Sequence, residues 1–561
     1  MVAAAQADRQ EAARRQRQQH VDAVVAAGAR NKIVVAGPGT GKTSLFRKVL
    51  DGRANTLTLT FVNALVEDLS LELFGLSEVR TLHSFARQQL EKLTPRSVRV
   101  FPKLSAVIRQ DALTLLGGDV DFDALFQNKA DSDENIEFYR KRRVYYGDYY
   151  GFSDIIYDAV RFFEEHPDRV PQYTQVVVDE FQDFNALEVA LIELLASRSP
   201  VLLAGDDDQA LYETLKCASA QHIRQRHGNA AFGYESFTLP YCSRCTRVII
   251  EALNDIISGA VRAGYLHGRI EKPFRYFDDP QKDRESDRYP SVVYGQVYAK
   301  QIPWFIQGRI REIAGQVRDK FSVLVIAPTR TQCRDIVEAL REKGFQNLHY
   351  MERQESPEPT LLEGLNLLLI DRTGNLGWRV TAKALLPAAD FEALLAETGK
   401  NEAPPPFCDM IPSALKKEVK ALVQVLRAAR DGKRGEDDNR AVNLFRQLGV
   451  DPVRMAMEFL RNQLTLPGKR LVDFGIRKVH MTVTTIPSSK GLAADYVFIT
   501  HFDDRYFIRD KDKSLVTDQD VCSFLVALTR ARRAVFLISS EKNKEPTFLK
   551  WIDKARIRGV G

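Results

Sequence analysis

The sequence predicts an α/β fold built on parallel β-sheets, and three short stretches carry that prediction. Residues 33–35 form an apolar run that enters a glycine-rich turn, and residues 44–50 continue as a helix. Residues 176–178 are three valines that end in two carboxylates, and the apolar run 200–204 ends in Gly-Asp-Asp-Asp-Gln. Buried apolar strands are typical of parallel sheets, which present ligands at the carboxyl ends of their strands.

The glycine-rich turn, Ala36 to Thr43, fits the pattern [A/G]-x-x-x-x-G-K-[S/T] of a phosphate-binding loop. Its glycines let backbone N–H groups turn toward a triphosphate, and the dipole of the following helix adds to the attraction. Lys42 is expected to hold the β- and γ-phosphates, and Thr43 to offer its hydroxyl to Mg²⁺. The predicted nucleotide-binding residues are Gly37, Pro38, Gly39, Thr40, Gly41, Lys42, Thr43 and Ser44. A plain glycine turn between strand and helix is the alternative.

Carboxylates follow the two downstream strands. Asp179 can hold Mg²⁺, and Glu180 can orient or deprotonate an attacking water. Helix capping is the alternative role for this pair. Gln209 is placed to sense the γ-phosphate and position that water. The acids at 206–208 would repel one another without a cation or basic partners, and Asp206 is predicted to be the structural member of the three.

Composition limits the class of protein. The chain has 561 residues, of which 44% are hydrophobic, enough for about three or four domains with real cores. No apolar run reaches the roughly 18 residues of a membrane span, so no membrane partner is expected. The formal net charge of +6 permits nucleic acid as a partner without arguing for it. Six cysteines without a disulfide-like spacing favour the cytoplasm, and Cys242 with Cys245 makes a poor zinc site.

Three further stretches are informative. Residues 1–19 lack the apolar core of a signal peptide and predict a solvated helix, with a transit peptide as the alternative. Residues 55–62 alternate polar and apolar side chains, which predicts a strand, and a helix is expected to open at residues 81–85. Residues 139–150 interleave Lys and Arg with Tyr, a pattern that can track a phosphate backbone and stack on bases. A solvated helix face explains that segment equally well.

Short strings in a fixed order give the chain a family resemblance. Besides the glycine-rich turn they are Thr60-Phe-Val-Asn63, Thr81-x-His83-Ser84, Val178-Asp-Glu-Phe-Gln-Asp183, Gly205-Asp-Asp-Asp-Gln209, Ser488-Ser-Lys-Gly-Leu492 and Val526-Ala-Leu-Thr-Arg530-Ala531. The chain resembles a superfamily 1 helicase of the UvrD/Rep type. The strings extend from residue 36 to residue 531, so the resemblance covers nearly the whole chain.

The resemblance implies two RecA-like parallel-sheet lobes with the nucleotide between them, each lobe carrying an inserted, mostly helical subdomain. The first lobe is expected at 1–94 and 171–235 with the insertion 95–170, and the second at 236–380 and 477–561 with the shortened insertion 381–476. Residues 321–327 are predicted to be a central strand of the second lobe.

The resemblance also implies a nucleotide site with ATP and Mg²⁺ as cofactors. Its catalytic residues are Glu180, Gln209, Arg244 and Arg530, its metal ligands are Thr43 and Asp179, and Gln19 and Gly491 join the phosphate loop as nucleotide contacts. Arg244 and Arg530 take the places of two arginines that contact the γ-phosphate. Gln18 competes with Gln19 for the place of an adenine-reading glutamine. Ser243 replaces the family's adenine-stacking tyrosine, which weakens the expected contact with the base.

The expected function is that of an ATP-dependent translocase or helicase on single-stranded DNA, with the 3′→5′ polarity of the family. Phe61, Asn63, His83 and Tyr212 are the implied DNA-binding residues. Single-stranded DNA or single/double-strand junctions are the implied partners, and a protein partner such as a nuclease is compatible with them. One alternative is a nucleic-acid-gated ATPase switch that remodels or signals to a partner. Another is an interaction module with a degenerate ATP site.

Overall fold

The computed structural model describes residues 2–61, 63–93, 98–130, 134–212, 217–280, 282–284, 291–345, 348–350, 358–400, 403–430, 479–508, 515–541 and 544–560. The chain divides into two compact units. Unit 1 comprises Met1–Phe85, Val160–Arg353 and Leu471–Gly561, and unit 2 comprises Ala86–Ala159 and Gln354–Arg470. Helices α4 (Leu82–Leu93) and α8 (Phe152–Glu165) each run from one unit into the other.

The first sheet of unit 1 has six parallel strands in the order β3-β2-β6-β7-β1-β8. Their bounds are β1 Asn31–Ala36, β2 Thr56–Thr60, β3 Glu78–Thr81, β6 Gln175–Val178, β7 Val201–Gly205 and β8 Tyr234–Leu239. The register pairs Val35 with Gly205 and Val178 with Leu203. The carboxyl ends of β1, β6 and β7 therefore lie at one edge, as expected for buried parallel strands.

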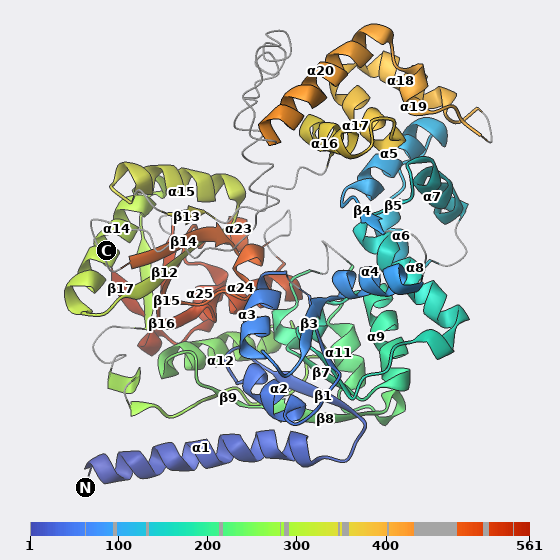
Figure 1. Cartoon of the computed structure of the whole chain (residues 1–561). Helices are drawn as coiled ribbons and strands as arrows, with labels where there is room; N and C mark the ends of the chain where they lie inside the picture. The colour runs from blue at the N-terminus through green and yellow to red at the C-terminus, as the bar shows by residue number, and fades with distance from the viewer. Residues whose placement is uncertain are drawn as a thin grey trace. The chain divides into compact units, whose positions relative to one another are not determined.

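The second sheet of unit 1 has seven parallel strands in the order β13-β14-β12-β15-β16-β11-β17. Their bounds are β11 Val292–Gln296, β12 Phe321–Ala327, β13 His349–Tyr350, β14 Val479–Thr485, β15 Ala494–Ile499, β16 Ala531–Ser539 and β17 Arg558–Val560. The predicted strand 321–327 is confirmed as β12. The two sheets confirm the predicted α/β fold with two parallel-sheet lobes (Figure 1).

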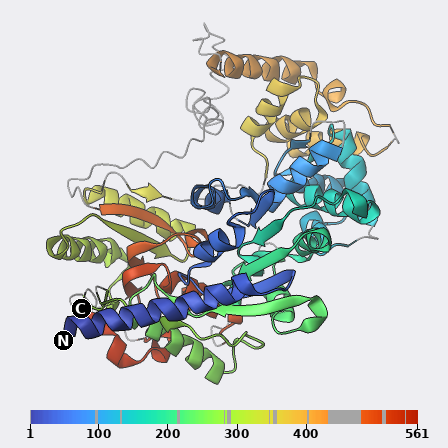
Figure 2. The ribbon, with the colours of Figure 1, turned by 60° about the horizontal axis from the view of Figure 1, so that its bottom comes forward.

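Helices cover both sheets of unit 1. They are α1 Val2–Ala26, α2 Lys42–Leu50, α3 Asn63–Glu72, α9 Ala186–Arg198, α11 Gln221–Arg226, α12 Arg247–Arg262, α14 Ile302–Gln316, α15 Arg330–Glu342, α23 Asp504–Phe507, α24 Asp518–Leu528 and α25 Thr547–Trp551. The long helix α1, seen whole in Figure 2, contacts the edge strand β8. Its Val21 and Val24 are buried in the first sheet's core, so the carboxyl-terminal end of α1 is fixed by packing.

Unit 2 is mostly helical. Its further elements are β4 Arg99–Val100, α5 Leu104–Leu115, α6 Phe122–Gln127, α7 Glu134–Tyr145, β5 Tyr149–Tyr150, α16 Leu361–Ile370, α17 Asn375–Leu385, α18 Ala388–Glu397, α19 Phe407–Met410 and α20 Ser413–Arg430. One apolar cluster joins Leu365 of α16, Trp378 of α17 and Leu422 of α20. Residues 354–380 therefore belong to unit 2, whereas the sequence placed them in the second lobe. The predicted border at 235 likewise falls inside β8, and residues 431–476 of the predicted insertion lie outside the described residues.

A buried ion network joins the two chain segments of unit 2. The Asp111 carboxylate on α5 accepts hydrogen bonds from Arg142 Nη2 at 2.8 Å and Arg379 Nη2 at 2.9 Å. Tyr146 donates its hydroxyl to the same carboxylate. All these side chains are buried, and Arg379 comes from a segment 268 residues further along the chain than Asp111.

The basic and aromatic segment 139–150 is largely committed to such internal contacts. Arg142 is bound to Asp111, and Arg143 Nη1 lies 2.7 Å from Asp158 Oδ2 and stacks over Tyr150. Tyr139 and Tyr146 are fully buried. These four side chains are therefore part of the core of unit 2, which neither the DNA-tracking nor the solvated-face interpretation anticipated.

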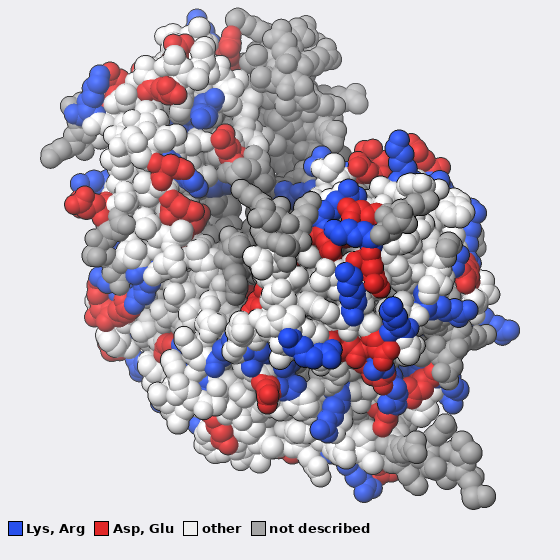
Figure 3. Space-filling view, turned by 180° about the vertical axis from the view of Figure 1, so that it is seen from behind, with Lys and Arg blue, Asp and Glu red and all other residues white. Residues whose placement is uncertain are grey.

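The surface carries charges of both signs. Figure 3 shows Lys and Arg interspersed with Asp and Glu over the described part of the face that it draws. Among the described helices, none combines the length and the apolar character needed to cross a membrane.

We expect Asp111→Ala to destabilise unit 2 by about 3–5 kcal/mol, because the change leaves two buried guanidinium groups without their counter-ion. Hydrogen exchange of the helices of unit 2 during urea unfolding measures the loss. Asp119→Ala, which removes the exposed carboxylate paired with Arg109 on the same helix α5, is the matched control and should change little. Equal effects of the two variants would contradict the importance of the buried network.

Candidate nucleotide-binding site

The glycine-rich turn forms a compact loop between β1 and α2. Gly39 and Gly41 have φ angles of +70° and +98°, in the left-handed region that side chains rarely adopt. Thr40 Oγ1 donates a 2.8 Å hydrogen bond to the carbonyl of Gly37, which closes the turn. Gly41 is the N-cap residue of α2, so the free N–H groups of the first helical turn begin at Lys42. The loop has the backbone shape that anion binding requires.

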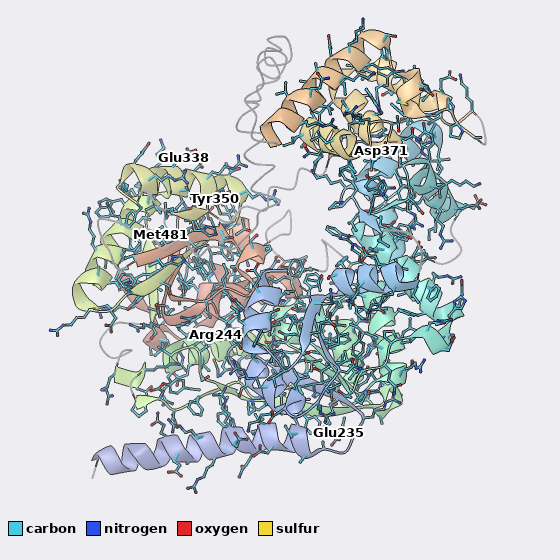
Figure 4. The ribbon with its side chains drawn as sticks, viewed as in Figure 1. Glu235, Arg244, Glu338, Tyr350, Asp371 and Met481 are labelled. Atoms are coloured by element: carbon cyan, nitrogen blue, oxygen red, sulfur yellow. The ribbon has the colours of Figure 1, made fainter. Side chains whose placement is uncertain are left out.

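Three side chains pack closely against the glycines of this loop, so a methyl group in place of a hydrogen would force a neighbouring group to move. A Cβ on Gly37 would lie 2.6 Å from the ring of Phe274, one on Gly39 would lie 2.3 Å from Cβ of Arg244, and one on Gly41 would lie 2.3 Å from Nη2 of Arg17. Figure 4 shows Arg244 where the two sheet-bearing parts of unit 1 meet, away from Met481 in the second sheet. The loop is thus covered by residues from α1 and from the segment after β8.

The Lys42 ammonium group is held by the two acids that end β6. Its Nζ lies 2.9 Å from Glu180 Oε1 and 3.5 Å from Asp179 Oδ1. Burial raises the pKa of Glu180, but the charges of Lys42 and Lys490 lower it more, so the pKa lies below its ordinary value and Glu180 is ionised. Glu180 also adopts a left-handed φ of +55°, a conformation that costs about 1–2 kcal/mol in a non-glycine residue.

Two side-chain amides connect the acids of β6 with those after β7. Gln182 Nε2 donates to Glu180 Oε2 at 2.7 Å, and Gln182 Oε1 accepts from the backbone N–H of Asp206 at 2.9 Å. Gln209 Nε2 donates to Asp206 Oδ2 at 2.6 Å. Asp206 therefore contacts both amides, although the sequence suggested a merely structural role for it.

Two cations reach this cluster from the part of the chain that builds the second sheet. Arg530 Nη2 donates to Gln209 Oε1 at 3.1 Å, and Lys490 Nζ donates to the Gln209 carbonyl at 2.8 Å. Lys490 also pairs with Asp183 and lies 3.8 Å from Glu180 Oε2. Burial, and next the positive charge of Arg244, lower the pKa of Arg530 to about 10. Two arginines close enough to repel each other in a buried site favour an anion between them.

The side of the site next to α1 differs from the prediction. Gln19 is exposed and lines a shallow hollow with Gln18 and Asp22, on another face of α1 from Arg17. Arg17 instead reaches the loop, with Nη2 3.4 Å from the carbonyl of Thr40. Gln16 and His20 lie four residues apart on the same side of α1. Gln16 accepts a hydrogen bond from the Tyr241 hydroxyl, and the His20 ring packs edge-on against the Tyr241 ring. The structure therefore does not bring Gln19 to the site.

The implied DNA-binding residues are placed only in part. Phe61 and Tyr212 are buried, 9% and 5% exposed, and their ring centroids are 5.0 Å apart. His83 is half-buried at the start of α4. Asn63 opens α3, and its side chain lies outside the described residues. The two aromatic rings thus pack on each other in this structure rather than presenting open faces.

The donor atoms fit a magnesium ion bound with a nucleotide. Thr43 offers a hydroxyl in the first turn of α2 and Asp179 a carboxylate at the end of β6, and Mg²⁺ prefers such oxygen ligands together with phosphates. In this structure the Lys42 ammonium group balances the charge of Asp179. Gly491, with φ +86°, follows Lys490 directly, so it lies in the stretch that reaches the cluster.

Several further groups at the site were given no role in catalysis or nucleotide binding by the sequence. The three acids 206–208 are the one group of potential metal ligands found among the described residues, and Lys272 lies among them at 2.5–2.9 Å. Cys242 and Cys245 flank Arg244, and the hydrogen bond from Cys245 lowers the pKa of the Cys242 thiol to about 6. Lys272, Phe274 and Arg17 lie outside the recognisable motifs, so no spacing signalled them. Lys490 stood inside a motif but was given no role.

Comparisons with known proteins agree with this geometry. A family model described as an AAA domain matches residues 19–215. DNA helicase II of Escherichia coli is 39% identical over 190 residues, which cover 33% of this chain and 24% of that protein. A probable DNA helicase II homolog of Rickettsia felis is 21% identical over 620 residues, covering 91% of this chain and 90% of that protein.

The printed names of these relatives describe DNA helicases, and the chain is similar to them over the shares given. A further relative, the ATP-dependent DNA helicase srs2 of Schizosaccharomyces pombe, is 26% identical over 130 residues, which cover 23% of this chain. The matches cover only 24% of the Escherichia coli protein and 14% of the Schizosaccharomyces pombe protein, so the chain spans well under two thirds of either relative.

We expect Gly39→Ala to weaken nucleotide binding by about tenfold or more, because the new methyl group would displace Arg244 from the loop. Titration with a fluorescent ATP analogue measures the dissociation constant. Gly52→Ala is the matched control, since Gly52 has nearly the same φ, +69°, but open space around it. The control should lose stability by about 1 kcal/mol from backbone strain alone and bind nucleotide normally. Equal losses of binding would assign the effect to strain rather than to contact with Arg244.

Proposed function

We propose that the protein hydrolyses ATP and uses the hydrolysis to move along single-stranded DNA with 3′→5′ polarity. One observation carries the proposal. Gln209, four residues after the first sheet's β7, is bound by both Arg530 and Lys490, which come from the chain that builds the second sheet. A catalytic cluster shared by two sheets links hydrolysis to their relative movement, and that link is what a motor requires.

The chemistry follows from the positions of the charged groups. Lys42 and the N–H groups of α2 would bind the phosphates, and Thr43 and Asp179 would hold Mg²⁺ with them. The bound ion would neutralise phosphate charge. Once a phosphate takes the Lys42 ammonium group, the ionised Glu180 carboxylate is free to orient the attacking water. Catalysis then rests on positioning and on charge stabilisation.

Arg244 and Arg530 would complete the site by neutralising charge that develops in the transition state. Such arginines contribute on the order of 10³–10⁵ to the rate in other phosphate-loop enzymes. Arg530 is fully buried and its pKa is lowered to about 10 by burial and by Arg244, so a trianionic phosphate would relieve an existing repulsion. This arrangement favours hydrolysis over simple nucleotide storage.

DNA as the partner is supported by the relatives, whose names describe DNA helicases. Phe61 and Tyr212 would have to separate from each other before either could stack on a base, an interaction worth about 1–3 kcal/mol per base. That buried pair specifically favours a second candidate function, an ATPase switch that senses nucleic acid without processive unwinding. A duplex with a 3′ single-stranded tail separates the two, because only a helicase displaces the paired strand.

We expect single-stranded DNA to raise the steady-state ATPase rate of the full chain by about tenfold or more. Glu180→Gln should bind ATP within a few-fold of normal and lose about 10² or more of the rate, since the amide cannot activate water. ATP turnover with and without an oligonucleotide is the measurement. A rate that DNA leaves unchanged would contradict the motor and the DNA-gated switch together, and normal turnover by Glu180→Gln would remove its assigned role.

We expect Arg530→Ala to abolish most of the DNA-stimulated rate while weakening ATP binding only a few-fold, because its contribution belongs mainly to the transition state. Lys42→Ala should instead damage phosphate binding in the ground state as well. Nucleotide titration and single-turnover hydrolysis of the two variants measure this contrast. Arg532→Ala, two residues away and exposed, is the matched control and should behave like the wild type. DNA-stimulated turnover in Arg530→Ala would make Arg530 a structural residue.

A further inference from the structure

The side chain of Lys272 ends among three carboxylates. Its Nζ lies 2.9 Å from Asp206 Oδ1, 2.5 Å from Asp207 Oδ1 and 2.9 Å from Asp208 Oδ2, and the side chain is 5% exposed. Burial lowers the pKa of Lys272, but the three acids raise it more, so the ammonium group stays protonated. Lys272 thus occupies the position that a bound cation would take in a comparable cluster of acids.

The other two cations of this cluster contact single acids. Arg224 Nε lies 3.0 Å from Asp207 Oδ2, and Arg269 Nε lies 2.8 Å from Asp208 Oδ1. Among the described cations, Lys272 is the one within 3 Å of Asp206. This difference matters because Asp206 alone among the three acids accepts a hydrogen bond from Gln209.

The Asp206 carboxylate divides its two oxygens between these partners. Oδ1 faces Lys272 at 2.9 Å and also accepts from the backbone N–H of Asp208 at 3.2 Å, and Oδ2 accepts from Gln209 Nε2 at 2.6 Å. The opposite end of the Gln209 amide, Oε1, accepts from Arg530. An amide held at both ends cannot turn over, so the charge on Lys272 fixes the orientation of Gln209 through one intervening carboxylate.

The segment that carries Lys272 also touches both sheet-bearing parts of unit 1. It follows α12, which contacts α24, α25 and β16 of the second sheet's side. The N–H of Leu266 donates to Asp518 at the start of α24, the helix that leads to Arg530. Phe274, two residues beyond Lys272, packs on Gly37 of the phosphate loop. The segment 266–274 therefore connects α24, the acids 206–208 and the loop.

We infer that Lys272 is a positioning residue for ATP hydrolysis, which holds Gln209 through Asp206 and couples that glutamine to the movement of the second sheet. This inference rests on the proposed function and deepens it, because it names a residue outside the recognised motifs. Among the described residues, the ion pairs of Lys272 are with the acids 206–208 and not with the phosphate loop. Its loss should therefore lower kcat rather than weaken ATP binding.

We expect Lys272→Met to lower the DNA-stimulated kcat by about tenfold or more and to change KM for ATP by less than about threefold. Arg224→Met and Arg269→Met are the matched controls, since each removes one cation from the same three acids and neither arginine forms an ion pair with Asp206. They should lose stability to a similar degree and keep kcat within about threefold of the wild type. Lys272→Arg, which keeps the positive charge, should have a kcat between those of Lys272→Met and the wild type.

Two results would overturn the inference. One is a kcat of Lys272→Met within about threefold of the wild type, and the other is an equal loss of kcat in all three variants, which would make the cluster purely structural. If Lys272→Met does not fold, the double variant Lys272→Met with Asp207→Asn removes one of the unpaired charges and is tested in its place against Asp207→Asn alone. A wild-type protein that hydrolyses no ATP would defeat the proposed function itself, and the inference with it, so the two failures are distinguishable.

Discussion

The ion pair between Lys42 and Glu180 is the contact on which the rest of the site depends. The ammonium group and the carboxylate are 2.9 Å apart and mostly buried, so neither can lose its partner without gaining another charge. Under the proposed function, a triphosphate would compete with Glu180 for Lys42, while Lys490 lies 3.8 Å from the other carboxylate oxygen. Binding of the phosphates and release of the carboxylate would then be one exchange of partners at a residue with a left-handed backbone.

Buried charges that are paired with opposite or polar groups also form the contacts between the two sheets of unit 1. Asp183 on the first sheet's side pairs with Lys490, and the Gln209 side-chain oxygen Oε1 accepts from Arg530. Lys490 and Arg530 both lie in the chain that builds the second sheet. Buried pairs of this kind are costly to break one partner at a time. Such pairs favour one particular arrangement of the two sheets, and under the proposed function a change of that arrangement would accompany hydrolysis.

The sequence predicted the first-sheet half of the site well, because parallel strands bring their carboxyl ends to one edge whatever the length of the connections. Ala36, Val178 and Gly205 end neighbouring strands, so the residues after them had to meet.

The predictions that the structure did not bear out, and the residues that were missed, also have physical causes. Lys272 contacts Asp207 across 65 residues, a distance at which spacing carries no signal. Gln19 was misplaced because polar residues surround α1 on all sides there, which hides the face that carries Gln16 and His20. Residues 354–380 were assigned to the second lobe because an apolar helix looks the same whichever core buries it.

The composition of unit 2 from two separate chain segments bears on how the protein is made. Asp111 and Arg379 are partners across 268 residues, and synthesis proceeds at about 5–20 residues per second, so the carboxylate leaves the ribosome roughly 15–50 s before this guanidinium group. During that interval Tyr145 lacks the apolar cluster of α16, α17 and α20 against which it packs in the folded protein. All strands of the first sheet, which end at Leu239, are therefore synthesised before Arg379 is available to complete the buried ion network of unit 2.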